Sequence, residues 1–142
     1  GNYIFPDDRT AVVVLTNQDA VGTFHGIGMD IAKALFDVQD AAATKALEQA
    51  KAIFANLQKG RIDRGLFTAD ANSYFDATAL HDYQTSLAPL GKPTSFTTRS
   101  AKKRGGMQMR GYTLTFPHKK LGITTYTLPD GKIEQYIVAS AD

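Results

Sequence analysis

Apolar positions in this chain recur with two different periods, one before and one after Pro93. Between residues 23 and 90 they return every three or four positions, which is the spacing of one face of an α-helix. After Pro93 they alternate with polar residues, as in strands with one buried face. Because helices come first and strands second, we expect an α+β fold in which the helices cover a sheet.

The helices are predicted from apolar stripes and from the residues that mark helix ends. The strongest stripe runs through residues 44–59, and Gly60 after it suits the left-handed position that follows a helix end. An earlier helix is expected over residues 23–36. Three shorter helices are also expected. Their N-cap residues are predicted to be Asp63, Thr68 and either Asp76 or Thr78.

The alternating part of the chain predicts an antiparallel meander of strands joined by short turns. The strands are expected over residues 95–101, 107–116, 121–128 and 133–139. Glycine and proline between them favour turns, most clearly in residues 102–106 and 129–132. One face of the resulting sheet is expected to pack on the helices.

The first residues form a pattern of their own. A hairpin is expected within residues 3–15, and the continuously apolar run Ala11–Leu15 is typical of a strand buried on both faces. We expect a boundary near Val38, between a segment of residues 1–38 and a domain of residues 39–142. The alternative is that the first segment joins the same domain as an added strand. A valine-rich strand left alone would expose an aggregation-prone edge.

Composition and charge exclude several classes of function. The chain has no cysteine, which excludes disulfides, thiolate nucleophiles and cysteine-bound zinc. The net charge is only +2, and the basic clusters 102–104 and 119–120 are expected at solvated hairpin tips, so we expect no nucleic-acid partner. No apolar run is long enough to span a membrane. The three histidines are not spaced as metal ligands, and we expect neither a metal nor a cofactor.

The first segment resembles part of a known enzyme family. Phe5–Asn17 resembles the last core strand of the serine β-lactamases and penicillin-binding-protein-like hydrolases. In that family a hydrophobic strand ends in an asparagine, and a C-terminal helix then packs on the sheet. Thr23–Phe36 would be that helix. The resemblance implies a parent enzyme that works in the periplasm or outside the cell.

The rest of the chain, from about Ala41 to Asp142, resembles a second kind of domain. It is similar to the small cystatin-like, nuclear-transport-factor-2-like domains that follow such hydrolase domains in some bacteria. The features that carry this resemblance are Gly60–Thr68, Tyr74-Phe75, Leu87–Pro93 and Gly131-Lys132-Ile133. The resemblance implies helices packed on a curved antiparallel sheet of about four strands, preceded by an extra strand and helix.

The catalytic residues of the hydrolase family have no counterpart in this chain. Those enzymes act through the serine of a Ser-x-x-Lys motif, and no serine here has lysine three residues later. The first residue is glycine, and we expect a longer protein whose nucleophile lies upstream. The first hypothesis is therefore a non-catalytic accessory or interaction domain. Its expected partners are the upstream hydrolase domain of the same protein and a second copy that dimerises through the open sheet face.

A second hypothesis rests on aromatic and polar side chains that a curved sheet could gather in one pocket. The set is Tyr74, His81, Tyr83, Arg99, Tyr112, Tyr126 and Tyr136. It would form a small-molecule site, or an isomerase-like one, between the helices and the sheet. Glu134 is the only carboxylate expected within the strands, so the simpler interpretation places these tyrosines in the core with their hydroxyls hydrogen-bonded at its edge.

Overall fold

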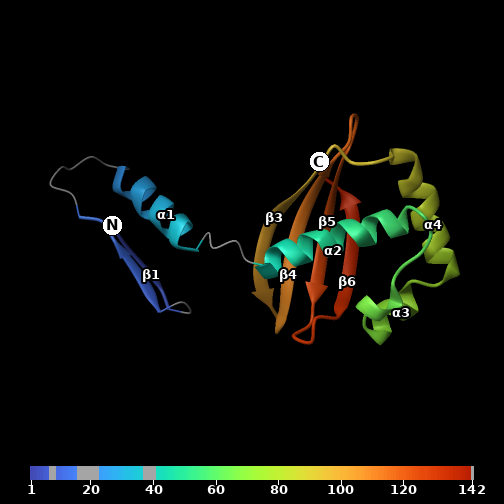
Figure 1. Cartoon of the computed structure of the whole chain (residues 1–142), viewed down its shortest axis with the longest axis horizontal. Helices are drawn as coiled ribbons and strands as arrows, with labels where there is room; N and C mark the ends of the chain where they lie inside the picture. Colours follow the sequence, from blue (N-terminus) through green and yellow to red (C-terminus); the bar gives the residue numbers. More distant parts are fainter. Residues whose placement is uncertain (7–8, 16–22, 37–40, 142) are drawn as a thin grey trace. The chain divides into compact units, whose positions relative to one another are not determined.

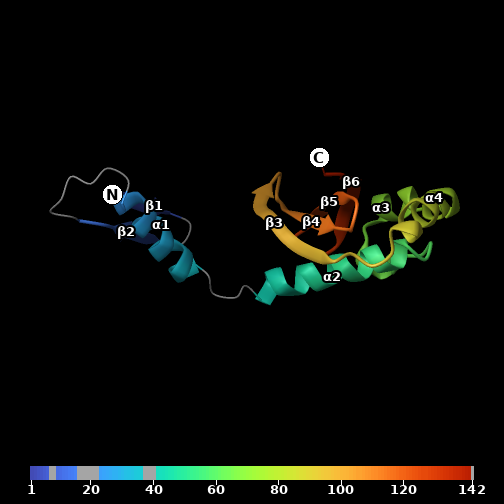
Figure 2. The same cartoon turned by 90° about the horizontal axis from the view of Figure 1, so that it is seen from above.

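Two compact units make up the chain, Gly1–Thr44 and Lys45–Asp142. The computed structural model describes residues 1–6, 9–15, 23–36 and 41–141. Within these ranges it describes only the backbone of residues 23–25, 33–36 and 41. The boundary predicted near Val38 falls outside the described residues. Figures 1 and 2 show the helices and strands of both units.

The first unit consists of a two-stranded hairpin and one helix. Its elements are β1 (Asn2–Phe5), β2 (Thr10–Val13) and α1 (Thr23–Phe36). The strands are antiparallel, with Tyr3 opposite Val12. α1 packs on the hairpin at Gly28, where the missing side chain leaves room for the Tyr3 ring. The predicted hairpin and helix are confirmed, and the turn residues Asp7 and Asp8 lie outside the described residues.

β2 is buried on one face only, so the prediction of a strand buried on both faces is wrong. Val12 is buried on the face that carries Tyr3 and meets α1. Val13 and Leu15 on the opposite face are 58% and 89% exposed. A strand is buried on both faces only when a layer covers each of them, and the described residues of this unit supply one layer. β2 pairs with β1 in a two-stranded sheet.

The second unit is an antiparallel sheet with helices on one face and beside one edge. Its helical elements are α2 (Ala41–Leu57), η1 (Arg64–Leu66), α3 (Ala69–Tyr74), α4 (Ala77–Leu87) and η2 (Ala88–Leu90). Its strands, in the order in which they pair, are β3 (Ser95–Arg104), β4 (Met107–Thr115), β5 (Lys120–Thr127) and β6 (Ile133–Ser140). α2 crosses one face of the sheet, while α3 and α4 lie beside β6 (Figures 1 and 2). The predicted α+β fold is confirmed.

The short helices begin where their capping residues predict. Asp63, Thr68 and Asp76 each accept a hydrogen bond from a backbone N–H two or three residues later, at 3.0, 3.2 and 2.8 Å. Asp76, rather than Thr78, is therefore the N-cap of α4. Gly60 follows α2 in the left-handed conformation, with a φ of 66°.

The hairpin between β3 and β4 is tighter than predicted. Residues 102–106 were expected to form the turn, but β3 continues to Arg104 and β4 begins at Met107. Gly105 and Gly106 both have positive φ, of 58° and 80°. Two consecutive residues with positive φ form a two-residue turn that matches the twist of the strands. The basic residues 102–104 before this turn therefore remain paired with β4.

The inner face of the sheet is filled by the core. From α2, Ile53, Phe54 and Leu57 are almost fully buried in this core. The buried strand residues that share the core include Tyr112, Leu114, Ile123 and Tyr136. The Tyr136 hydroxyl donates a 2.8 Å hydrogen bond to the carbonyl oxygen of Ala50. Side chains therefore fill the inner face at the middle of the sheet, and two cavities lie at its β6 side.

Candidate functional site

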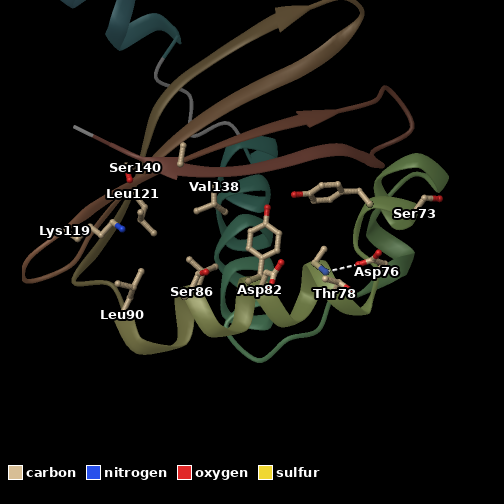
Figure 3. A pocket seen from close by; sticks show the side chains of 15 residues that line it. Ser73, Asp76, Thr78, Asp82, Ser86, Leu90, Lys119, Leu121, Val138 and Ser140 are labelled. Atoms are coloured by element: carbon tan, nitrogen blue, oxygen red, sulfur yellow. Dashed lines mark hydrogen bonds between the residues drawn. The ribbon is translucent and has the colours of Figure 1, made fainter.

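An open groove runs between α4 and the neighbouring ends of β5 and β6 (Figure 3). Its volume is about 770 Å³, within the roughly 300–1,000 Å³ of typical ligand pockets. The apolar part of its lining includes Leu87, Leu90, Leu121 and Val138. The polar part consists of Ser73, Tyr74, Asp76, Thr78, Asp82, Tyr83, Ser86, Lys119 and Ser140. The groove thus combines apolar side chains with a larger number of polar ones.

Four of the nine polar lining residues come from α4. Thr78, Asp82 and Ser86 are spaced by four residues, so they follow each other along the same face of the helix. The Asp76 carboxylate is occupied by its cap hydrogen bond to the Ala79 N–H. The Asp82 carboxylate forms no ion pair or hydrogen bond with another described residue. Asp82 is therefore a carboxylate of the groove without a partner among the described residues, while Asp76 keeps its charge and its second oxygen.

One cation lines the groove at its far end. Figure 3 shows Lys119 beside Ser140, at the end of β6, while Ser73 and Asp76 lie at the opposite end. The Lys119 ammonium group forms no ion pair with another described residue. The groove therefore has a charge gradient along its length, from the carboxylates of Asp76 and Asp82 to the ammonium group of Lys119.

Tyr83 and Tyr74 stand inside the groove and pack on a common neighbour. Their ring centroids lie 5.7 and 5.2 Å from that of Phe75, which is buried. Burial raises the pKa of Tyr83 above its usual value, and its hydrogen bond to Tyr74 raises the pKa further. At neutral pH the Tyr83 hydroxyl is therefore protonated, so it can donate or accept a hydrogen bond but cannot act as a base.

Two further tyrosines from the predicted site belong to the core instead. Burial raises the pKa of both Tyr112 and Tyr136, and most strongly that of Tyr136. Arg110 and Thr125 lie near the Tyr112 hydroxyl and lower its pKa, but burial outweighs them. No described group meets the geometry of a hydrogen bond with that hydroxyl, although Thr125 is close. The two side chains thus differ: Tyr136 is hydrogen-bonded at the edge of the core, and Tyr112 is not.

The structure distributes the seven predicted site residues over four places. Tyr74 and Tyr83 line the groove, and Tyr112 and Tyr136 lie in the core. Arg99 lies against Gly111 on the outer sheet face, opposite α2. Tyr126 lies on the same outer face, because it pairs with Met109 two positions from Gly111. His81 is exposed on α4 and does not line the groove.

Sequence reasoning did not assign Asp82, Ser86, Lys119 or Ser140 to a site. The sequence does contain a signal for Asp82 and Ser86. Polar residues spaced by four along α4 are predicted to share one face of that helix. Lys119 was expected at a solvated hairpin tip, and it does lie in the turn before β5. Its position beside Ser140 depends on the pairing of β5 with β6, which brings Leu121 opposite Ser140.

A smaller cavity of about 410 Å³ lies between α3 and β6. It shares Tyr74 with the groove, and its carboxylates are Asp70 and Glu134. Across the part of the chain that the structure describes, no three histidine or carboxylate side chains are grouped to hold a metal ion. The same residues include no helix that combines the length and apolar character needed to cross a membrane.

No protein-family model, curated protein or solved structure matches this chain. Its function is therefore inferred from the exposure of the two units and from the geometry of the groove.

Proposed function

We propose that this chain is the C-terminal part of a β-lactamase-like serine hydrolase, and that residues 45–142 act as its non-catalytic accessory domain. Its partner would be the hydrolase domain of the same protein. The proposal includes a location in the periplasm or outside the cell, because enzymes of the resembling family work there. Dimerisation through the outer sheet face stays a prediction.

The observation that carries this proposal is the uneven exposure of large apolar side chains. The described residues include eight that are exposed, and six of them belong to Gly1–Thr44. The six are Ile4, Val13 and Leu15 in the hairpin segment and Ile27, Met29 and Ile31 on α1. Large apolar patches on a soluble protein mark surfaces that another part or partner covers. The exposure of these six side chains supports the proposal that the first unit is part of a larger domain.

The position of these side chains supports a sheet domain in particular. Ile4 and Val13 share the hairpin face opposite Tyr3 and Val12, which is the face away from α1. A second layer on that face would bury them, as in a sheet with helices on both sides. The last strands and C-terminal helix of a serine hydrolase domain would need such a layer.

The gene upstream of the codon for Gly1 provides the test. We expect the reading frame to encode a Ser-x-x-Lys motif, and we expect the longer protein to lose turnover or soluble assembly when residues 45–142 are removed. A reading frame that starts at this chain would contradict the proposal. Unchanged turnover and assembly after the deletion would contradict the accessory role.

The purified 142-residue chain offers a complementary assay. We expect it to hydrolyse neither a chromogenic β-lactam nor a p-nitrophenyl ester above the rate in buffer, because no Ser-x-x-Lys motif is present. Turnover that a serine-directed fluorophosphonate abolishes would overturn the non-catalytic role.

A second candidate function is ligand binding between the helices and the sheet, and the groove favours it. Two of the predicted residues, Tyr74 and Tyr83, line that groove together with Asp82 and Lys119. This function is compatible with the first, since an accessory domain can hold a ligand. A rise in melting temperature with a metabolite, lost in Asp82→Asn, would support it.

A further inference from the structure

β6 has an edge whose second half pairs with no strand among the residues that the structure describes. It is the last strand in the sheet order, so only its side toward β5 is paired. Antiparallel pairs alternate between hydrogen-bonded and non-hydrogen-bonded positions. The Ala141 N–H donates to Lys120 at 3.1 Å, and the register then makes Ser140, Val138 and Tyr136 the non-hydrogen-bonded positions. Their backbone N–H and C=O groups therefore point toward the open edge.

The beginning of the same edge already binds an extended segment of the chain. The Thr68 N–H donates to the Ile133 carbonyl oxygen at 3.0 Å, and Phe67 pairs with Ile133 in the parallel direction. Among the described residues, no segment continues this pairing along β6 beyond Ile133. The edge thus already pairs with one parallel segment at its beginning, and its second half pairs with no described segment.

The groove lies along this unpaired half. Val138 and Ser140 line it from β6, and α4 forms the opposite wall (Figure 3). The apolar floor includes Leu87 and Leu90, which can receive every second side chain of a strand laid beside β6. The site combines edge hydrogen-bonding groups with pockets for side chains, which is how proteins bind peptides by strand addition.

The charges of the groove fix the direction and the ends of such a ligand. An occupant parallel to β6 ends near Ser140, where Lys119 lies, and begins toward Asp82. We propose that the groove binds an extended peptide that adds to β6 as a parallel strand, with a carboxylate beside Lys119 and a basic side chain beside Asp82.

An extended peptide fits these observations better than a compact metabolite. The backbone groups that point toward the edge recur at every second residue, and those of Val138 and Ser140 lie at the groove. Only another extended backbone presents donors and acceptors with the same spacing. This inference deepens the second candidate function, on which it rests, and it is independent of the hydrolase assignment.

A phage-displayed library of random decapeptides with free C-termini, selected on the full 142-residue chain, tests the inference. We expect selected peptides to carry a basic residue several positions before an acidic or terminal carboxylate. In ¹⁵N NMR titrations they should shift the backbone amides of Val138, Ser140 and α4. N-methylation removes a peptide N–H donor, and alternate residues of an added strand point their N–H groups toward β6. Methylating those residues should raise Kd at least tenfold, and methylating the residues between them should raise it less than twofold.

Protein variants provide the matched comparison. Lys119→Glu should weaken Kd for the selected peptides at least tenfold, because it places a like charge beside the ligand carboxylate. Lys120→Glu changes the neighbouring residue, which does not line the groove, and should change Kd less than twofold. The N-methylated peptides need no protein variant, so the test holds even if one variant does not fold.

Several outcomes would overturn the inference. They are recovery of no binding peptide, amide shifts confined to the outer sheet face, and N-methylation effects that do not alternate. A metabolite that raises the melting temperature through Asp82 while no peptide binds would keep the second candidate function and remove the peptide ligand. The upstream reading frame tests the hydrolase assignment separately.

Discussion

Both units of this chain contain regular secondary structure, but the burial of their described side chains differs greatly. In Gly1–Thr44 the described side chains that are both apolar and buried are Val12 and Ala32. In Lys45–Asp142 one continuous core joins α2, the short helices and the strands of the sheet. The difference shows that a correctly formed hairpin and helix need not make a domain, because stability comes from burying their apolar faces against further layers.

The largest expected difference in stability is between two truncated variants, one with a shortened apolar side chain in each unit. Phe54→Ala removes a ring that is 2% exposed and should cost the second unit about 3–5 kcal/mol of unfolding free energy. Leu15→Ala removes a side chain that is 89% exposed and should change the stability by less than about 0.5 kcal/mol. Urea unfolding followed by circular dichroism measures both.

The same pair of variants sharpens the comparison in the longer protein that we propose. If a hydrolase domain covers the first unit, Leu15→Ala should there cost about 2 kcal/mol or more, as for a buried leucine. An equally small effect of Leu15→Ala in both proteins would show that the first unit is not covered.

An intermediate difference in stability is expected between variants of two buried tyrosines. The hydroxyl of Tyr136 is hydrogen-bonded, and that of Tyr112 has no described partner. Tyr136→Phe removes the hydrogen bond to the Ala50 carbonyl and should cost about 1 kcal/mol. Tyr112→Phe removes a hydroxyl with no described partner, so it should change stability by less than about 0.5 kcal/mol or raise it. Equal costs in urea unfolding would mean that Tyr112 has a hydrogen-bond partner in solution.

The smallest expected effect concerns two glycines of α1 in the first unit. A side chain at Gly26 would meet nothing within 4 Å, so Gly26→Ala should stabilise the helix by up to about 1 kcal/mol. A Cβ at Gly28 would lie 2.2 Å from a Tyr3 ring carbon, so Gly28→Ala must displace that ring and should lose this gain. Hydrogen exchange of the α1 and β1 amides distinguishes them. Equal protection in the two variants would show that α1 does not pack on β1 through Gly28.

The elements of this fold were predictable because their signals are local. Asp63, Thr68 and Asp76 cap helices through bonds to backbone groups two or three residues away. Gly60 and the glycine pair 105–106 supply conformations that other residues rarely adopt. The end of β3 was misjudged because polar residues that pair in a long hairpin look like a loop in the sequence.

The candidate site was less predictable because its parts come from distant segments. The seven predicted residues share side-chain types, but only Tyr74 and Tyr83 line the groove. Alternation relates residues of one strand only, so the opposite faces of Tyr112 and Tyr126 follow from the register of β4 with β5. The position of Lys119 beside Ser140 follows from strand register, to which no local pattern points.

By itself, the sequence determined the helices, the strands, their order and most of their ends, since these depend on propensity, period and capping within a few residues. The tertiary structure alone decided which faces are covered. It buried Tyr112 and Tyr136, left Val13 and Leu15 exposed, and opened a groove between α4 and β6. Burial depends on contacts between segments that are far apart in the chain. The spacing of apolar residues predicts which face of an element is apolar, but not which element packs against it.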